Sequence, residues 1–271
     1  MLETSRRWRR EGHSIGLVPT MGALHAGHMS LVTQACRDNA RVVVSIFVNP
    51  IQFGPAEDLE RYPTSLPRDV EMIERAGVAA VYTPTAAVMY PPGATSRVRV
   101  GGVAEPLEGS LRPRHFEGVA TVVTKLFNAA QPDRAYFGQK DAQQVAVVKR
   151  MALDLDTGVE ICVCPTVREA DGLALSSRNA YLGPDERKAA GCLSRALRWA
   201  AGAYGAGERD SGRLRQGILE ILHAEAKATV AYAELVNPGT FEPPGTLAVL
   251  AVWIGKTRLL DNHDLAQPFP G

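Results

Sequence analysis

Apolar side chains in the first 165 residues alternate between short continuous runs and stretches with helical spacing. The runs predict strands at Ile15–Thr20, Arg41–Asn49, Val78–Thr83, Arg134–Phe137 and Val159–Val163. Near-continuous apolar runs are typical of parallel strands covered on both faces. Helical spacing between them predicts helices near 29–38, 69–76, 117–130 and 142–153. Strand, helix and strand within about 35 residues form a βαβ unit, so this part predicts a parallel α/β sheet.

The pattern changes after Pro165. Two helical stretches, 184–203 and 208–227, precede strand-like runs at 230–236, 246–254 and 258–261, which is typical of a small α+β domain. Residues 84–114 form an excursion in which Val98 and Val100 alternate like a short strand. We therefore expect a Rossmann-like parallel-sheet domain over 1–165 and a smaller α+β C-terminal domain over 166–271.

Composition excludes several classes of protein. The 30 lysines and arginines against 29 aspartates and glutamates give a net charge of +1, so no bulk attraction to nucleic acid or membrane is implied. No window approaches the ~18 continuous apolar residues of a membrane span. The arginine-rich residues 6–10 are not followed by the apolar segment of a secretory signal, and they fit a short helix with a solvated face. We expect a cytoplasmic protein.

The cysteines favour no disulfide framework. Cys36, Cys162, Cys164 and Cys192 are spread over a chain of 271 residues. Cys162 and Cys164 would share one face of a strand and could join two histidines in a zinc site, but no C-x-x-C pairing supports this. Small apolar side chains in a reduced protein are the preferred interpretation.

The turn Met21–His28 carries the first candidate chemistry. It joins the first strand to the first helix and contains Gly22, Gly27, His25 and His28. A helix N-terminus offers unpaired N–H groups and a positive dipole end, which suit phosphate, and glycine lets the backbone approach a ligand. Histidine can donate to phosphoryl oxygens. The alternative is a tight turn whose histidines only cap the helix.

A pair of amide side chains, Asn49 and Gln52, follows the second strand. Open α/β sheets bind ligands at the carboxyl ends of their strands. Amides both donate and accept, so these two suit a hydroxyl or a carboxylate. Ordinary turn chemistry around Pro50 is the alternative.

The segment Gly138–Asp141 repeats the design of strand, glycine turn and helix. Lys140 could meet nucleotide phosphates, and Asp141 could cap the helix or bind a ribose. A lysine exposed without function is the alternative. Gln143 and Gln144 face different directions as neighbours on a helix, so one of them is expected to point into the cleft.

A loop over 167–179 holds the cluster Ser176-Ser177-Arg178. Two hydroxyls and a guanidinium suit phosphates, which arginine binds through several donors at once. A surface loop with serines at helix N-caps is the alternative. Gly255-Lys256-Thr257 resembles the end of a P-loop, but Leu250 stands where its first glycine is needed, and no long helix is expected to follow. No G-x-G-x-x-G follows the first strand, so a nicotinamide cofactor is not expected.

Taken together, these residues resemble the pantothenate synthetases, the pantoate–β-alanine ligases of the HxGH nucleotidylyltransferase superfamily. The ordered set that carries the resemblance is PTMGALHAGH, FVNPIQFGP, RPRHFEGV, FGQKDAQQ and DGLALSSRN. The resemblance covers almost the whole chain, as far as the segment GKTRLLDN. The resemblance implies an ATP-dependent ligase of coenzyme A biosynthesis. Pantoate would react with ATP to give pantoyl adenylate and pyrophosphate, and β-alanine would then displace AMP.

The resemblance also implies roles for individual residues. His25, His28, Lys140 and Arg178 would carry the chemistry. The nucleotide site would comprise Pro19, Met21, Gly22, Ala23, Leu24, His25, Ala26, Gly27, His28, Gly138, Gln139, Lys140, Asp141, Val167, Leu175, Ser176, Ser177 and Arg178. The substrate set would be Asn49, Gln52, Gln144, Val122 and Val123 for pantoate, with Arg112 and His115 near β-alanine. Magnesium would accompany ATP, with Asp69 as a protein contact, and the protein would be a homodimer.

The chain departs from the family pattern at several positions. Ala26, Gln139 and Asn237 stand where acidic residues are frequent, Arg114 replaces a small residue, and Arg68 replaces a second acid beside Asp69. None of these departures removes a group that the chemistry needs. Another HxGH nucleotidylyltransferase, whose product keeps the nucleotide, is the alternative enzyme. A nucleotide-sensing module that binds ATP without turnover is the alternative outside enzymes.

Overall fold

The chain forms two compact units in this computed structural model. The structure describes residues 1–55 and 59–270. One unit comprises Met1–Gly138 and Gln144–Pro165, and the other comprises Gln139–Gln143 with the residues from Thr166 onward. The segment 139–143 thus belongs with the second unit although its neighbours on both sides belong to the first. The sequence placed this segment in the first domain, because only contacts between residues far apart along the chain reveal where it packs.

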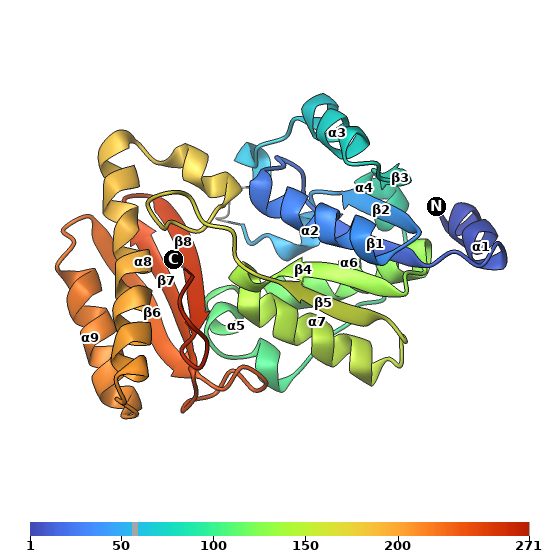
Figure 1. Ribbon diagram of the computed structural model, residues 1–271. Coiled ribbons are helices and arrows are strands. Elements are labelled where there is room, and N and C mark those ends of the chain that lie inside the picture. The colour runs from blue at the N-terminus through green and yellow to red at the C-terminus, as the bar shows by residue number, and fades with distance from the viewer. Residues whose placement is uncertain (56–58, 271) are drawn as a thin grey trace. The chain divides into compact units, whose positions relative to one another are not determined.

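A parallel sheet forms the centre of the first unit (Figure 1). Its five strands lie in the order β3-β2-β1-β4-β5, and every neighbouring pair is parallel. The strands are β1 (Ile15–Thr20), β2 (Arg41–Ile46), β3 (Ala80–Tyr82), β4 (Arg134–Gly138) and β5 (Glu160–Cys164). The strand order reverses beside β1, so the turn that follows β1 lies at the switch point where such sheets bind ligands. The predicted Rossmann-like sheet is confirmed.

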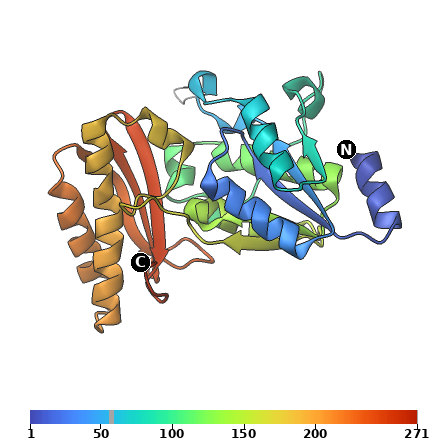
Figure 2. The same cartoon turned by 45° about the horizontal axis from the view of Figure 1, so that its top comes forward.

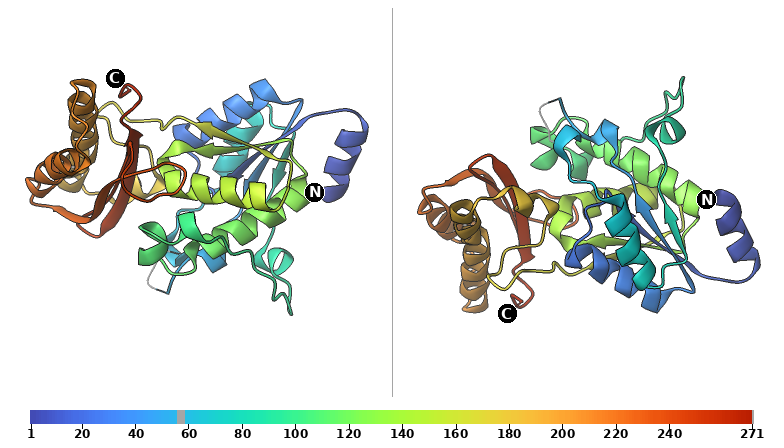
Figure 3. Two further views of the ribbon diagram at one scale, coloured as in Figure 1. Left: turned by 90° about the horizontal axis from the view of Figure 1, so that it is seen from below. Right: turned by 90° about the horizontal axis from the view of Figure 1, so that it is seen from above.

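Helices cover both faces of this sheet (Figure 3). The helices on the sheet are α2 (Ala26–Asp38) and α3 (Leu66–Arg75) on one face and α6 (His115–Ala130) and α7 (Ala142–Asp154) on the other. The remaining helices of this unit are α1 (Leu2–Arg10), α4 (Ala86–Met89) and α5 (Glu108–Leu111). Leu17 and Val43 belong to a core shared with α6 and α7, while their strand neighbours Val18 and Val44 belong to a core shared with α2 and α3. Side chains alternate between faces along a strand, so continuous apolar runs feed both cores.

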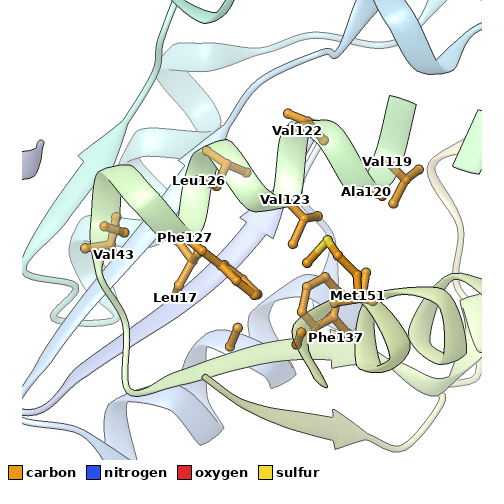
Figure 4. Close-up of a cluster of buried hydrophobic side chains, with 14 of the residues drawn as sticks. Leu17, Val43, Val119, Ala120, Val122, Val123, Leu126, Phe127, Phe137 and Met151 are labelled. Carbon is orange, nitrogen blue, oxygen red and sulfur yellow. The ribbon is translucent and has the colours of Figure 1, made fainter. Parts of the chain in front are cut away.

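The core beneath α6 is built from large apolar side chains (Figure 4). Val123 points toward Phe137 and Met151, whereas Val122 lies on another side of the helix. The arginine-rich start forms α1, whose Trp8 is buried in this core while Arg6, Arg7, Arg9 and Arg10 are exposed. The helix with a solvated face is therefore confirmed.

The short strand predicted at Val98 and Val100 is wrong. Both residues have no regular secondary structure, although their side chains pack against the first core. The backbone N–H of Val98 donates to Thr121 Oγ1 at 2.9 Å, so a side chain on α6 replaces a strand partner. Alternating apolar residues indicate which side chains are buried, and they do not show that the backbone finds a neighbouring strand.

The second unit pairs two helices with an antiparallel sheet, as expected for a small α+β domain (Figure 2). Its elements are α8 (Pro184–Gly205), α9 (Ser211–His223), β6 (Ala228–Val236), β7 (Leu247–Ile254) and β8 (Thr257–Asp264), with strand order β6-β7-β8. Alternate residues of the strands, among them Leu235 and Leu250, pack with Leu193 and Ile218 of the helices. In the described part of the chain, no helix is both long and apolar enough to span a bilayer.

The P-loop-like segment Gly255-Lys256-Thr257 is a hairpin turn. Ile254 pairs with Thr257, which leaves Gly255 and Lys256 as a two-residue connection between β7 and β8. Gly255 has φ +57°, a conformation that glycine adopts without strain at the first position of such turns. The sequence resembles a phosphate loop only because both structures need glycine at a sharp reversal.

Candidate functional site

The turn between β1 and α2 requires glycine. Gly22 and Ala23 have φ values of +88° and +49°, in the left-handed region. A Cβ on Gly22 would lie 3.1 Å from Asp69 Oδ2 and 3.2 Å from Ile46 Cγ2, so a side chain would be strained by the backbone and would press on both neighbours. The turn therefore favours glycine at position 22.

Asp69, in the first turn of α3, holds this turn in place. Its two carboxylate oxygens accept from the backbone N–H groups of Ala23, at 2.8 Å, and Leu24, at 2.9 Å, and the residue is 1% exposed. Thr20 adds a second tether, because its hydroxyl accepts from Gly22 N and donates to Ser45 O. Both oxygens of Asp69 thus accept from the protein backbone, which gives Asp69 a structural role at this turn, while the magnesium contact stays a prediction. Sequence reasoning missed this structural role, because Asp69 lies 46 residues from Ala23 and 45 residues from Leu24 in the chain.

His25 and His28 form a reciprocal cap at the start of α2. His25 Nδ1 accepts from Gly27 N at 3.2 Å, and His28 Nδ1 accepts from His25 N at 3.4 Å. Their rings lie 4.1 Å apart. A ring nitrogen that accepts carries no hydrogen, so both neutral imidazoles have their proton on Nε2. The capping alternative is therefore realised, and it fixes the rings in the tautomer that can donate to a phosphoryl oxygen through Nε2.

The Asn49 and Gln52 pair lies in a buried hydrogen-bond network. Asn49 Nδ2 donates to Gln52 Oε1 at 2.9 Å and to Gly118 O at 3.1 Å, and the hydroxyl of Tyr90 donates to Asn49 Oδ1 at 2.7 Å. Burial raises the pKa of Tyr90 to about 12, so its hydroxyl stays a donor at neutral pH. At 1% exposure and with both ends of its amide hydrogen-bonded within the protein, Asn49 orients Gln52.

This network determines which end of Gln52 is available. Because Gln52 Oε1 accepts from Asn49, the amide group Nε2 is directed away from that bond, and it reaches Met21 Sδ at 3.2 Å. The structure thereby brings together Gln52 and the turn after β1, and it presents Gln52 as a donor. Tyr90 was not singled out by the sequence, since it lies 41 residues from Asn49 in an irregular segment.

His115 supports the same turn from the start of α6. Its Nδ1 lies 2.9 Å from Gln52 O, and its Nε2 lies 3.0 Å from Arg112 Nη1. A carbonyl can only accept and a guanidinium can only donate, so neutral His115 carries its proton on Nδ1. Arg112 also forms an ion pair with Glu108 at 3.7 Å. The predicted β-alanine pair is therefore joined to the Gln52 turn.

Close packing between α6 and this turn depends on Gly118. A Cβ there would lie 2.6 Å from both Gln52 Cα and Ile51 O, closer than Cβ atoms approach other atoms in proteins. Val122 and Val123, predicted beside pantoate, are 7% and 3% exposed and belong to the core of the first unit. Gln144 is partly exposed, whereas Gln143 is 5% exposed, so the two glutamines differ as expected for neighbours on a helix.

Lys140 and Asp141 lie in the short helix η4 (Gln139–Asp141), which belongs to the second unit. Lys140 Nζ forms an ion pair with Asp141 Oδ1 at 3.1 Å, and the side chains are 20% and 44% exposed. The lysine therefore has a carboxylate partner, and solvent reaches both groups.

The loop that leads to Arg178 is ordered by contacts within the second unit. Leu175 N donates to Val167 O at 2.9 Å, and Arg168 and Ala174 form an antiparallel bridge. Ser176 caps the short helix η5 (Ser177–Tyr181), with its Oγ accepting from Arg178 N at 3.3 Å. The N-cap alternative is thus realised for Ser176.

Arg187 of α8 braces the outer part of this loop. It pairs with Glu169 at 2.8 Å and with Asp171 at 3.0 Å. The hydrogen bond from Arg187 holds the pKa of Asp171 below its usual value. Gly172 has φ +90°, and a Cβ there would lie 2.4 Å from Ser194 Oγ. The loop is therefore pinned at its tip by α8.

A zinc site at the cysteines is not formed by the described residues, where no group of three or more His, Cys, Asp or Glu could hold a metal. Burial raises the pKa values of the Cys162 and Cys164 thiols, whereas zinc binds the thiolate.

The family model for pantoate–beta-alanine ligase matches residues 1–264. The chain is 52% identical over 267 residues to a pantothenate synthetase of Herpetosiphon aurantiacus, with 96% of this chain and 97% of that protein covered. Among solved structures, pantothenate synthetase from Thermus thermophilus is 46% identical, with 93% of each chain covered and a TM-score of 0.91.

A more distant solved relative has its ligands bound. It is the pantoate–beta-alanine ligase of Francisella tularensis, complexed with Beta-gamma ATP and beta-alanine. It is 34% identical, with 98% of this chain and 96% of that chain covered and a TM-score of 0.81. Agreement in sequence and in fold extends over both units, and the chain belongs to the pantoate–β-alanine ligase family.

Proposed function

We propose that this ligase joins pantoate to β-alanine through a pantoyl-adenylate intermediate. A carboxylate oxygen of pantoate attacks the α-phosphorus of ATP, and the bond from that phosphorus to the bridging oxygen breaks to release pyrophosphate. The amine of β-alanine then attacks the acyl carbon, loses a proton, and expels AMP with the anhydride oxygen. The observation that carries the proposal is the family match over residues 1–264.

The turn after β1 would hold the ATP phosphates. The N-terminus of α2 and the Nε2–H groups of His25 and His28 would supply donors. From the family resemblance, His25 would be a phosphate anchor and His28 would act at the α-phosphate. Pro19, Met21, Gly22, Ala23, Leu24, Ala26 and Gly27 complete this part of the nucleotide site. A cap of fixed shape is suited to phosphoryl transfer, which depends on positioning more than on a protein nucleophile.

Residues of the second unit would neutralise charge on the phosphates. Lys140 acts as a point charge in the transition state, while Ser177 and Arg178, with Ser176 as their cap, hold the leaving pyrophosphate. Gly138, Gln139, Asp141, Val167 and Leu175 contribute backbone and ribose contacts. We propose that residues 1–165, apart from the segment 139–143, bind nucleotide and pantoate, whereas residues 166–271 carry the phosphate loop and belong with the segment that carries Lys140.

Pantoate would bind to the donor end of Gln52. A carboxylate or hydroxyl oxygen of the substrate accepts from Nε2, and Gln144 supplies a second amide. Asn49 acts through Gln52, and Arg112 and His115 hold the backbone of the same turn while β-alanine approaches. The gem-dimethyl group of pantoate would lie against the α6 surface at Val122 and Val123.

Magnesium would enter as part of the substrate. Asp69 offers no oxygen that is not already bound to a backbone N–H, and the described residues form no carboxylate cage. Mg²⁺ commonly binds through substrate phosphates and water with few protein ligands, which fits these residues. We also propose that the enzyme is a cytoplasmic homodimer, which light scattering and cell fractionation would test.

Isotope exchange between pyrophosphate and ATP tests the proposed first step. Label enters ATP when pyrophosphate reverses the formation of pantoyl adenylate. The exchange should therefore require pantoate and proceed without β-alanine, which takes part only in the second step. Exchange with another carboxylic acid but not with pantoate would contradict the substrate assignment. A product that keeps the nucleotide would instead identify another HxGH nucleotidylyltransferase, and ATP binding without exchange would identify a sensing module.

A further inference from the structure

The pair Asp261-Asn262 on β8 has no part in the proposed chemistry, although both residues are buried. Asp261 is 2% exposed and Asn262 is 5% exposed. Burying an acid and an amide is costly unless each is well hydrogen-bonded. Their partners therefore indicate what the pair does.

The side chain of Asn262 is bound to the turn that carries Lys140. Its Nδ2 donates to the backbone carbonyl oxygens of Gln139, at 3.0 Å, and Lys140, at 2.8 Å. Its Oδ1 accepts from Gln139 Nε2 at 3.1 Å. Two carbonyl acceptors and one N–H donor fix the orientation of the amide, and the amide in turn holds the two peptide groups on either side of the Lys140 Cα.

Asn262 is itself held by a buried ion pair. Arg168 donates to both oxygens of Asp261, at 2.7 and 2.9 Å, and to Gly172 O at 3.1 Å. The side chains of Arg168 and Asp261 are 9% and 0% exposed, so this bidentate pair is shielded from solvent. Asp261 Oδ1 also accepts from Asn262 N at 2.8 Å. Through Asn262, the Arg168–Asp261 ion pair thus links the Lys140 turn to the start of the loop that carries Ser176–Arg178.

We propose that Asn262 is a positioning residue, which holds the backbone at Lys140 so that the ammonium group meets the developing charge on the phosphates. This rests on the role proposed for Lys140. An ammonium on a flexible stem is a point charge whose effect depends on where its backbone is held. Asn262 supplies that constraint with two donors to carbonyl oxygens, and Asp261 keeps Asn262 in register.

The test compares Asn262→Ala with its neighbour His263→Ala. His263 is also buried on β8, and its Nε2 lies 3.0 Å from Gln267 O, away from the Lys140 turn. Asn262→Ala should lower the rate of pantoate-dependent pyrophosphate exchange about 10- to 100-fold, the scale of a misplaced catalytic group, with KM for pantoate changed less than about 2-fold. His263→Ala should lower the melting temperature with a near-parental rate. Equal rates for the two variants would overturn the proposal.

A double-mutant cycle with Lys140→Ala separates positioning from general stability. Lys140→Ala alone should lower the exchange rate at least ~100-fold. If Asn262 acts through Lys140, adding Asn262→Ala should change that rate less than about 3-fold, whereas multiplication of the two losses would overturn the proposal. A near-parental rate for Lys140→Ala would refute the role of the lysine itself. A damaged Lys140→Ala enzyme beside a normal Asn262→Ala enzyme would refute only the present inference. If Asn262→Ala does not fold, the isosteric Asn262→Asp carries the same test.

Discussion

The two strand–turn–helix segments, Gly22–His28 and Gly138–Asp141, are held by opposite chemistry. In the first, a carboxylate of Asp69 accepts from two backbone N–H groups. In the second, an amide of Asn262 donates to two backbone carbonyls. Both side chains are buried, and each hydrogen-bonds two backbone groups of its turn.

The difference follows from the direction in which each turn presents its peptide groups. The first turn passes through two left-handed residues, Gly22 and Ala23, and directs consecutive N–H groups at α3. The second turn is a short helix, and its first carbonyls point at β8. A repeated sequence design therefore does not imply a repeated support, and the support must be found elsewhere in the chain.

The largest effect is expected for Asp69→Ala. Each buried N–H left without a partner costs about 1–3 kcal/mol, so the loss of two partners should lower the free energy of unfolding by about 2–6 kcal/mol. Urea denaturation measures this, with exposed Glu71→Ala on the same helix as the control, expected within about 0.5 kcal/mol of the parent. If Asp69→Asn is instead as stable as the parent but needs a higher magnesium concentration for activity, a metal contact for Asp69 would be favoured.

Asn262→Asp tests the opposite polarity of the second turn. A carboxylate at position 262 would face two carbonyl oxygens, which disfavour its charge and raise its pKa above about 3.9. A raised pKa favours the folded state only while the group is protonated. As pH rises from 5 to 8, the variant should therefore lose stability relative to the parent. Its pyrophosphate exchange rate relative to the parent should fall by about 10-fold or more at the upper end of this range. Asn237→Asp, at an exposed position, is the control. A flat ratio of variant to parent would contradict the assignment.

Alanine substitutions at Gly22 and Gly138 should differ in their cost to stability, by less than the effects above. Gly22→Ala places a side chain in the left-handed region beside Asp69, which should cost about 1–2 kcal/mol of unfolding free energy. Gly138 lies outside that region, and a Cβ there would meet no atom within 4 Å. Gly138→Ala should therefore stay within about 0.5 kcal/mol of the parent by thermal or urea unfolding. Equal losses would show that the first turn is not the strained one.

The smallest effect is expected for Tyr90→Phe, which lies outside both turns. It removes one hydrogen bond to Asn49, worth about 0.5–1.5 kcal/mol, and loosens the orientation of Gln52. KM for pantoate should rise about 2- to 10-fold, while KM for ATP and the melting temperature change little. A change confined to ATP would remove Gln52 from the pantoate site.

The strands and helices were predictable, because continuous apolar runs and helical spacing mark them directly. Boundaries near polar residues were not: β2 ends at Ile46, and Asn49 follows in a buried turn instead of ending the strand. The alternation of Val98 and Val100 gave burial correctly and strand structure wrongly, since it contains no information on a pairing partner.

The supports of the site could not be predicted from local patterns. Asp69, Tyr90 and Asn262 each act on residues between 41 and 123 positions away, and nothing in their own neighbourhoods distinguishes them from ordinary surface or strand residues. The resemblance named the candidate ligands, whereas the structure supplied the side chains that hold their backbone. Asp261-Asn262 lies within a quoted motif, and that was the one available signal.

The placement of residues 139–143 has a consequence for exchanging parts between relatives. A chimaera joined at residue 165 would take the lysine turn from one parent and position 262 from the other, so Gln139 and its amide partner would no longer be matched. An exchange that respects the packing must move these five residues together with the chain from Thr166 onward. The residues that must be exchanged together are thus not continuous in the sequence.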